Sequence, residues 1–271
     1  VKLVLALVAS MLAAAVAGAA PTVAPTVAPL PRLLSETGYG APDATPFAPR
    51  YPLWTDGAAK RRWIALPAGT AIDKTNRDAW QFPPGTKLWK EFAFDRPVET
   101  RMIERLADGT WRFASYVWRA DGRDAELAPE NGIRALPAAG APNGRYVVPS
   151  RNDCLACHEG ASVPVLGYSA VQLETTLAPA LGYLHGNCGH CHNATQAVAG
   201  VDMVLAQSAL DPQASAEATR ASALARAARI VERMRSTNPY TRMPPLGVQV
   251  PDGEGIALVA AWIHRHQEKS P

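Results

Sequence analysis

The sequence predicts an α+β fold, with an antiparallel β-rich domain in the N-terminal part of the chain and an all-α domain in the C-terminal part. Tryptophans, β-branched residues and turn signals are frequent between residues 51 and 148, where helical periodicity is weak, and this pattern favours strands. Helical patterns follow at 212–235 and 252–266. The 271 residues, 48% of them hydrophobic, suffice for one or two domains with a buried core.

Four segments of the N-terminal part have the composition of strands: Trp63–Leu66, Lys87–Phe94, Arg101–Leu106 and Trp111–Trp118. Asp108-Gly109, between the last two, is a typical hairpin signal, and Asp121-Gly122 is a second one. Tryptophans are concentrated in this part of the chain, and we expect most of them in a buried core rather than at a substrate-stacking surface. They are Trp54, Trp63, Trp80, Trp89, Trp111 and Trp118.

The first 19 residues have the layout of a secretory signal, in which Lys2 precedes an apolar stretch that ends in the small residues Ala17, Gly18 and Ala19. A membrane anchor is the alternative, but about 15 apolar residues are fewer than the roughly 20 that a membrane-spanning helix needs. We therefore expect residues 1–19 to be removed as a signal peptide, and the mature protein to reside in the periplasm.

Three further segments follow the predicted signal peptide. Residues 20–49 form a Pro-rich linker, with the repeat PTVA, and an N-terminal extension. Residues 50–175 form the β-rich domain, and residues 176–271 form the helical domain. The 27 basic and 24 acidic side chains give a net charge of +3 without a dense basic run, so the charge pattern of a nucleic-acid-binding protein is absent.

All four cysteines belong to two CxxCH sequences, and one sequence lies in each predicted domain. The first consists of Cys154, Cys157 and His158, and the second of Cys188, Cys191 and His192. In such a sequence two thiols attach one haem c covalently and the histidine is an axial ligand of its iron. A zinc cluster built from both motifs is the alternative. Export favours two haem groups, since free thiols with structural zinc are more typical of reducing compartments.

Residues from about 180 to 271 resemble a class I cytochrome c domain. The resemblance rests on the attachment sequence 187–193, on the string RMPPLG that contains Met243, and on a terminal helix at 252–266 with an apolar stripe. It implies an all-α cytochrome c domain in which His192 and Met243 are the axial ligands. A methionine before two prolines cannot continue a helix, so its thioether is held on a stiff loop. Met234 is the competing ligand.

Bis-histidine ligation of the second haem is a further alternative. The histidines that could take part are His185, His190, His264 and His266. We expect them to be surface or packing residues, because His190 lies inside the attachment turn and the last two lie on the terminal helix.

The β-rich part followed by the first CxxCH resembles cytochrome c-prime-beta and its hydroxylamine-oxidising relatives. Two strings carry this similarity: FPPGTKLWKE at residues 82–91 and DGTW at residues 108–111. The chain from residue 51 onward also resembles a group of exported bacterial proteins that end in a cytochrome c domain and have no established activity.

The sixth ligand of the first haem is not evident from the sequence. No histidine precedes His158, and Met102 is the only methionine of the β-rich stretch, so the first iron is expected to have an open position. In the hydroxylamine-oxidising relatives a lysine is bonded to the haem, and Lys87 or Lys90 could be proposed for that role. We expect both to be solvated. Ligation by Met102, or no haem at the first motif, are the remaining alternatives.

These patterns together predict a periplasmic dihaem c-type cytochrome that acts in electron transfer. Its partner would be a periplasmic dehydrogenase, a terminal oxidase or another cytochrome. The alternative is a haem oxidoreductase that acts on a small nitrogen or oxygen species at an open first haem, with the second haem as an electron relay. A zinc-stapled binding module is the third possibility.

Overall fold

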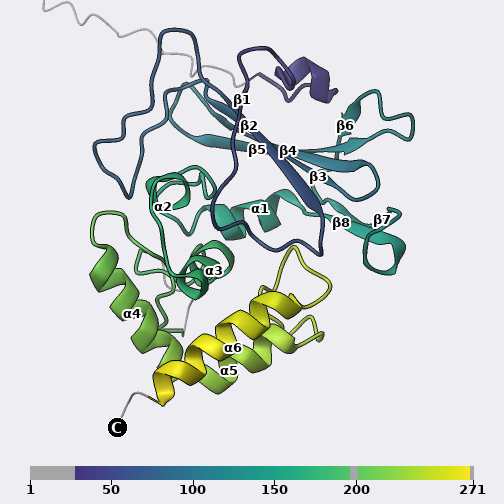
Figure 1. Cartoon of the computed structure of the whole chain (residues 1–271). Coiled ribbons are helices and arrows are strands. Elements are labelled where there is room, and N and C mark those ends of the chain that lie inside the picture. Colours follow the sequence, from purple (N-terminus) through teal and green to yellow (C-terminus); the bar gives the residue numbers. More distant parts are fainter. Residues whose placement is uncertain (1–27, 196–200, 269–271) are drawn as a thin grey trace, which may run out of the picture.

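The computed structural model describes residues 28–195 and 201–268 (Figure 1). The predicted signal peptide, residues 1–19, and the first part of the Pro-rich linker lie outside the described residues. None of the helices in the described part of the chain is long and apolar enough to span a bilayer.

A six-stranded antiparallel sheet dominates the N-terminal part, and its strands follow one another in chain order. The strands are β1 (Thr45–Pro46), β2 (Ala59–Ala65), β3 (Lys87–Ala93), β4 (Pro97–Arg105), β5 (Trp111–Trp118) and β6 (Ala125–Leu127). The four predicted strands are confirmed, although β2 and β4 begin four residues earlier than predicted. Asp108-Gly109 forms the expected hairpin, in which Gly109 has a φ of 84° and the Asp108 carboxylate accepts from the Thr110 N–H at 2.8 Å.

The two faces of the sheet contact different parts of the molecule. Trp89 pairs with Trp63 on one side and Met102 on the other, and this face packs on the short 3-10 helix η1 (Leu34–Thr37). Trp80 and Trp89 are buried and the other four tryptophans of this part are half-buried, so the expectation of a mainly buried set holds only in part. The opposite face carries Lys90 and lies against the first CxxCH motif.

A small two-stranded sheet leads from the large sheet into the first helices. It consists of β7 (Ile133–Pro137) and β8 (Arg145–Val148), which are connected through the 3-10 turn η2 (Pro142–Gly144). Helix α1 (Arg151–His158) follows, and α2 (Ala170–Leu173) comes after a loop. Figure 1 shows α1 between the large sheet and the C-terminal helices.

The C-terminal helices are α3 (Pro179–Asn187), α4 (Pro212–Ala225), α5 (Ala227–Arg235) and α6 (Gly253–Gln267). The predicted helix over 212–235 is broken at Arg226, where φ is −129° and ψ is 21°. Helix α6 begins after Asp252, whose side chain accepts from the Gly255 N–H at 3.0 Å, as the sequence predicts. Its apolar stripe forms a core with residues of α3, α4 and α5. The stripe consists of Ile256, Val259, Trp262 and Ile263, all buried.

The predicted fold class, an antiparallel β-rich domain followed by an all-α class I cytochrome c domain, is wrong. The structure is a β-rich chain built on the large N-terminal sheet, and two of the six α-helices in the described residues, α1 and α2, come before residue 176. The C-terminal part is only partly helical, because the described residues of 188–211 and 236–252 form turns and extended loops. These two segments contain the second CxxCH motif and Met243-Pro244-Pro245, where turn residues and prolines interrupt helices.

The sheet and the C-terminal part also share a hydrophobic core. Ile64 and Leu88 of the sheet pack in one cluster with Val165, Val171 and Ala209. Tyr51 extends this contact, since its hydroxyl donates to the Thr175 carbonyl at 2.9 Å and accepts from the Leu177 N–H at 2.6 Å. This packing brings the two CxxCH motifs to the same region of the molecule.

Candidate functional site

The first CxxCH motif is the second half of α1. Ser150 and Asp153 cap the start of this helix reciprocally, because the Asp153 N–H donates to the Ser150 hydroxyl at 3.1 Å and the Asp153 carboxylate accepts from the Ser150 N–H at 2.9 Å. Cys154, Cys157 and His158 follow on the helix and are all partly buried. Burial raises the pKa of the Cys154 thiol.

The imidazole of His158 has a defined tautomer. Its Nδ1 lies 2.5 Å from the Pro164 carbonyl oxygen, and because a carbonyl only accepts, Nδ1 carries the proton. Burial lowers the pKa of His158 to about 4, so the ring is neutral at pH 7 and its Nε2 keeps a free lone pair. A backbone carbonyl that fixes one ring nitrogen while the other faces a metal is the usual arrangement of metal-binding histidines. His158 therefore has the chemistry of an axial ligand.

The second CxxCH motif forms a turn directly after α3. The Cys188 carbonyl accepts from the Cys191 N–H at 3.1 Å and from the His192 N–H at 2.9 Å, which closes a single helix-like turn. The side-chain amide of Asn193 donates to the Gly160 carbonyl at 2.9 Å and to the His190 carbonyl at 3.1 Å. Asn193 thus connects the turn of the second motif to the end of the first.

His192 is a buried histidine with an unsatisfied nitrogen. The residue is 8% exposed, and its Nδ1 has no hydrogen-bond partner in the described part of the chain. Burial lowers the pKa of His192, and the nearby charge of Arg233 lowers it further. Because buried polar atoms are normally hydrogen-bonded, an unpartnered imidazole nitrogen is a position that a ligand or metal would occupy.

Met243 lies on the loop between α5 and α6. Its N–H donates to the Arg233 carbonyl at 3.0 Å, and the Arg233 side chain returns a hydrogen bond to the Thr241 carbonyl at 2.8 Å. Met243, Met234 and Cys188 line one small cavity of about 30 Å³. Met234, the competing ligand, is 8% exposed and belongs to the helical core, whereas Met243 is half-buried on its loop.

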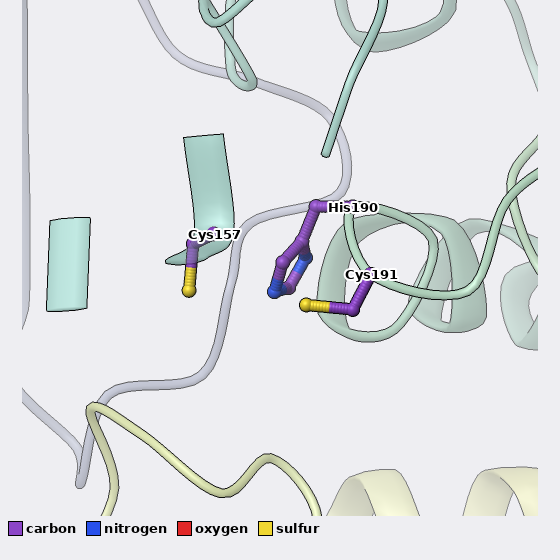
Figure 2. Close-up of side chains that lie close together, drawn as sticks. All are labelled: Cys157, His190 and Cys191. Atoms are coloured by element: carbon purple, nitrogen blue, oxygen red, sulfur yellow. The ribbon is translucent and has the colours of Figure 1, made fainter. Parts of the chain in front are cut away.

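The two motifs lie against each other. The ligand atoms of Cys157, His190 and Cys191 all lie within 4.8 Å of one another, and Figure 2 shows the three side chains pointing together. The Cys157 thiol donates a hydrogen bond to Cys191, which raises the pKa of Cys157 to about 12 and lowers the pKa of Cys191. These three donors could also hold a metal ion such as zinc. His190, expected at the surface or in packing, lies between the motifs.

The other histidines, His185, His264 and His266, contact groups other than the motif sulfurs. His185 is half-buried on α3, and its Nδ1 accepts from the Gln207 N–H at 3.0 Å. Burial lowers the pKa of His185 to about 4. His264 is exposed and its Nε2 lies 3.3 Å from a Glu268 carboxylate oxygen, while the His266 Nδ1 lies 2.8 Å from the Trp262 carbonyl oxygen. The positions of His264 and His266 agree with surface or packing roles, whereas His185 lines the same cavity as the first motif.

A cavity of about 670 Å³ is lined by residues of the sheet, of the first motif and of the turn that holds the second motif. Its volume falls within the range of roughly 300–1,000 Å³ that is usual for small-molecule and cofactor sites. Among the side chains that line it are Arg62, Lys90, Arg101, Cys154, Cys157 and His158. The first motif therefore faces a space of the size that a cofactor needs.

The two lysines that the sequence singles out lie on opposite faces of β3. Lys87 is on the face away from the cavity, and its Nζ donates to the Thr37 carbonyl at 3.0 Å. Lys90 lines the cavity, so the expectation that it is solvated is wrong. Burial, together with the nearby charges of Arg62 and Arg101, holds the pKa of Lys90 well below its usual value. Met102 is 1% exposed and packs with Trp89 in the core.

The residues present fit haem c differently at the two motifs. At the first, the neutral imidazole of His158 and the thiols of Cys154 and Cys157 border the large cavity. At the second, the thiol, imidazole and thioether groups are correct in chemistry, but the adjoining cavity of about 30 Å³ is much smaller than a cofactor site.

Comparison with known proteins supports the second motif independently of its geometry. Residues 188–247 match the family model described as Planctomycete cytochrome C, and this range contains Cys188, Cys191, His192 and Met243. A search of curated proteins and a search of solved structures gave no match. The resemblance of the N-terminal part to cytochrome c-prime-beta and hydroxylamine-oxidising proteins is not supported by these comparisons. The family match and the CxxCH sequences together support a c-type cytochrome that binds haem c.

Proposed function

We propose that this chain is a periplasmic dihaem c-type cytochrome that transfers electrons between two covalently bound haem groups and a redox partner. The observation that carries the proposal is the contact between the motifs, where Cys157 and Cys191 lie within 4.8 Å of each other. Two attachment sites at this separation would place both cofactors in the same region of the molecule. The family match over 188–247 adds support for the second site.

At the first site, Cys154 and Cys157 would form the two thioether bonds and the Nε2 of His158 would be the axial ligand. The Pro164 carbonyl orients that imidazole, since it accepts the Nδ1 proton at 2.5 Å. When bound, the haem supplies one-electron redox chemistry at its iron. The chain supplies attachment, ring orientation and exclusion of water by the surrounding core.

At the second site, Cys188 and Cys191 would form the thioether bonds, and His192 and Met243 would be the axial ligands. A thioether opposite an imidazole raises the reduction potential, which suits an electron acceptor. The loop of Met243 is connected to α5 through the Arg233 carbonyl at 3.0 Å, so this hydrogen bond would set the approach of the thioether.

The cellular setting follows from the sequence. The signal-like residues 1–19 favour export, and covalent haem attachment takes place in the exported protein. We propose a periplasmic dehydrogenase, terminal oxidase or second cytochrome as the partner. The proposed division into a first haem segment over 50–175 and a second over 176–271 assigns one motif to each segment.

The large cavity favours a second candidate function. It borders His158 on the side of the sheet and has a volume of about 670 Å³. An iron with an open coordination position beside this space could act on a small nitrogen or oxygen species, with the second haem as relay. The chain would then be a haem oxidoreductase rather than a pure electron carrier.

The visible spectrum of the reduced protein, with and without carbon monoxide, tests these proposals. A pure electron carrier has two six-coordinate haem groups whose bands do not shift with carbon monoxide. An oxidoreductase has one haem whose bands shift, and the double variant Cys154→Ala/Cys157→Ala abolishes that shift. A protein without haem bands would refute both proposals and leave the zinc-stapled module.

A further inference from the structure

Three basic side chains form one row across the large sheet, on the face that borders the cavity. Arg62 of β2 pairs with Lys90 of β3, and Lys90 pairs with Arg101 of β4. Residues that are directly opposite in neighbouring strands lie on the same face, and all three side chains line the cavity. Like charges in such positions repel one another. We call these three residues the cation row.

Only one member of the cation row has an acidic partner. The Nε and Nη2 atoms of Arg101 each donate to the Glu99 carboxylate at 2.9 Å, and the Tyr146 hydroxyl donates to the same carboxylate at 2.5 Å. Arg62 and Lys90 have no hydrogen bond or ion pair from their side chains to any described residue, although Lys90 Nζ lies 4.7 Å from the centre of the Phe92 ring. The Glu99 carboxylate is therefore bonded to Arg101 and Tyr146 and makes no hydrogen bond or ion pair with Arg62 or Lys90.

The other carboxylates around the cavity are also engaged elsewhere. Asp78 accepts from the Ser208 hydroxyl at 2.5 Å and from the Ala209 N–H at 2.6 Å. Asp153 caps α1, and Asp211 caps α4 through the Ala214 N–H at 3.0 Å. None of the three bonds to the cation row.

Burial makes these unpaired charges unfavourable. Arg62 is only 8% exposed, and its burial lowers the pKa of its guanidinium to about 10. Removal of a charged group from water is costly unless another charge or a set of hydrogen bonds compensates it. No described residue compensates the charge of Arg62 in this way, and Lys90 is compensated only in part, by the face of the Phe92 ring and by the more distant charge of Glu99.

Two neutral groups near the row have unsatisfied polar atoms as well. Ser115 of β5 pairs with Arg101, and its buried hydroxyl has no hydrogen-bond partner among the described residues. Trp80 lines the cavity, is 3% exposed and has an indole N–H without a partner in the same part of the chain. Buried polar groups of native proteins are normally satisfied. Arg62, Lys90 and the Trp80 indole N–H would therefore be satisfied by an acceptor that carries negative charge.

We propose that Arg62 and Lys90 bind an anionic group, a carboxylate or a small oxyanion, in the cavity beside His158. The guanidinium of Arg62 is a planar donor that matches the two oxygens of such a group, and the ammonium of Lys90 supplies a second positive charge. Arg101 is the third cation of the row, but its charge is balanced by the ion pair with Glu99.

The position of the cation row allows two sources for this anionic group. One is the carboxylate side chains of a haem attached at Cys154 and Cys157, and in this case the inference rests on the proposed function. The other is a free oxyanion, which would be the substrate class of the oxidoreductase candidate. The chemistry at Arg62 and Lys90 is the same in both cases, and the experiment separates them.

The test is isothermal titration of the full-length protein with sodium acetate and sodium sulfate in a low-salt, chloride-free buffer. It compares the haem-loaded protein with the double variant Cys154→Ala/Cys157→Ala, whose missing first haem is verified by a haem count. Both proteins are titrated as they are, with the added substitution Arg62→Gln, and with the added substitution Lys90→Gln. Arg134→Gln is the matched control, because Arg134 is exposed on β7 and lies outside the cavity.

A free oxyanion is supported as the ligand if both proteins bind the anion. Arg62→Gln or Lys90→Gln should then weaken binding about tenfold or more, and Arg134→Gln should leave it unchanged. Binding to the double-cysteine variant alone supports the carboxylates of the haem, because they occupy the row in the loaded protein. No binding to either protein, or binding that Arg62→Gln and Lys90→Gln leave unchanged, overturns the inference. The haem count is independent of these titrations, so failure of the proposed function is recognised separately.

A stability measurement keeps the inference testable where a glutamine variant does not fold. In the Cys154→Ala/Cys157→Ala protein without added anion, Lys90→Met removes repulsion from Arg62, so we expect the thermal midpoint of unfolding to rise. Sulfate should raise the midpoint of the Cys154→Ala/Cys157→Ala protein and leave the midpoint of its Lys90→Met variant unchanged. Lys90→Arg keeps the charge and should keep the sulfate response. A lower midpoint for Lys90→Met together with an unchanged sulfate response would show that Lys90 is merely structural.

Discussion

Cys157 of α1 and Cys191 of the turn after α3 lie with their sulfur atoms within 4.8 Å of each other, so the two CxxCH motifs are in direct contact. His190 belongs to the same group of three donors. Two haem groups attached at these cysteines would be neighbours, and charge on one iron would act on the other through a medium of low dielectric constant. The electronic properties of the two sites should therefore be coupled.

The proposed coupling is measurable by potentiometric titration of the haem-loaded protein. We expect two reduction steps whose midpoints depend on each other. In the variant Cys154→Ala/Cys157→Ala, the remaining haem should titrate as a single one-electron step with a shifted midpoint. If the second haem has the same midpoint in the presence and absence of the first, the sites are independent and the contact has no electronic consequence.

Met243→Ala should lower the reduction potential of the second haem, because loss of the thioether removes a ligand that favours the reduced iron. It should also make that haem reactive toward carbon monoxide. The control is Met234→Leu, a volume-conserving change in the helical core that should cost less than about 1.5 kcal/mol of stability and leave the potential unchanged. The opposite result, in which only Met234→Leu lowers the potential, would identify Met234 as the ligand.

His185 should make the stability of the protein depend on pH. The pKa of His185 is lowered to about 4 in the folded state by burial, against about 6.5 in the unfolded chain. The unfolded chain binds the proton more strongly, so the free energy of unfolding is at its full value above pH 6.5. It falls as the pH drops toward 4, by about 3 kcal/mol for this group.

The variant His185→Asn separates this contribution from other titrations. The Asn oxygen can accept from the Gln207 N–H as the His185 Nδ1 does at 3.0 Å, and it does not titrate. Urea unfolding at pH 7 and pH 4.5 should show a smaller loss of stability in the variant than in the parent protein. Equal losses would mean that His185 is not the titrating group.

Gly182 should be intolerant of a side chain, because it allows Tyr51 to pack on α3. A Cβ atom at Gly182 would overlap the Tyr51 ring, so Gly182→Ala should destabilise the protein by about 1–3 kcal/mol. Gly253→Ala is the matched control, since no atom lies within 4 Å of a Cβ built at that first residue of α6. Urea unfolding of both variants checks this, and equal stabilities would contradict the packing role of Tyr51.

Local chemistry explains which elements could be predicted from the sequence. Both ends of β5 are predicted correctly, because Asp108-Gly109 marks the turn before it and the aromatic residues at 111, 113, 116 and 118 favour a strand. Asp252 marks the start of α6 as a capping residue. The break at Arg226 has no such signal, since the alanine- and arginine-rich residues around it all favour a continuous helix.

The arrangement of the site depends on tertiary packing and register, which the sequence does not contain in readable form. Cys157 and Cys191 come together only because the sheet, α1 and α3 share one region of the molecule. Lys90 was expected in solvent, because its pairing with Arg62 and Arg101 depends on strand register. The C-terminal part is not all-α, because the three short motifs do not determine the residues between them, and the described residues of 188–211 and 236–252 form turns and loops.

The most direct test of the dihaem assignment is the ratio of covalently bound haem to protein. It is measured by the alkaline pyridine assay and by the mass of the intact chain, on protein produced with periplasmic haem maturation. We predict two haem groups for each chain, with peptide mapping that places one at Cys154 and Cys157 and the other at Cys188 and Cys191. A single haem would contradict the dihaem assignment and confine the redox chemistry to one motif. No bound haem would contradict a c-type cytochrome altogether.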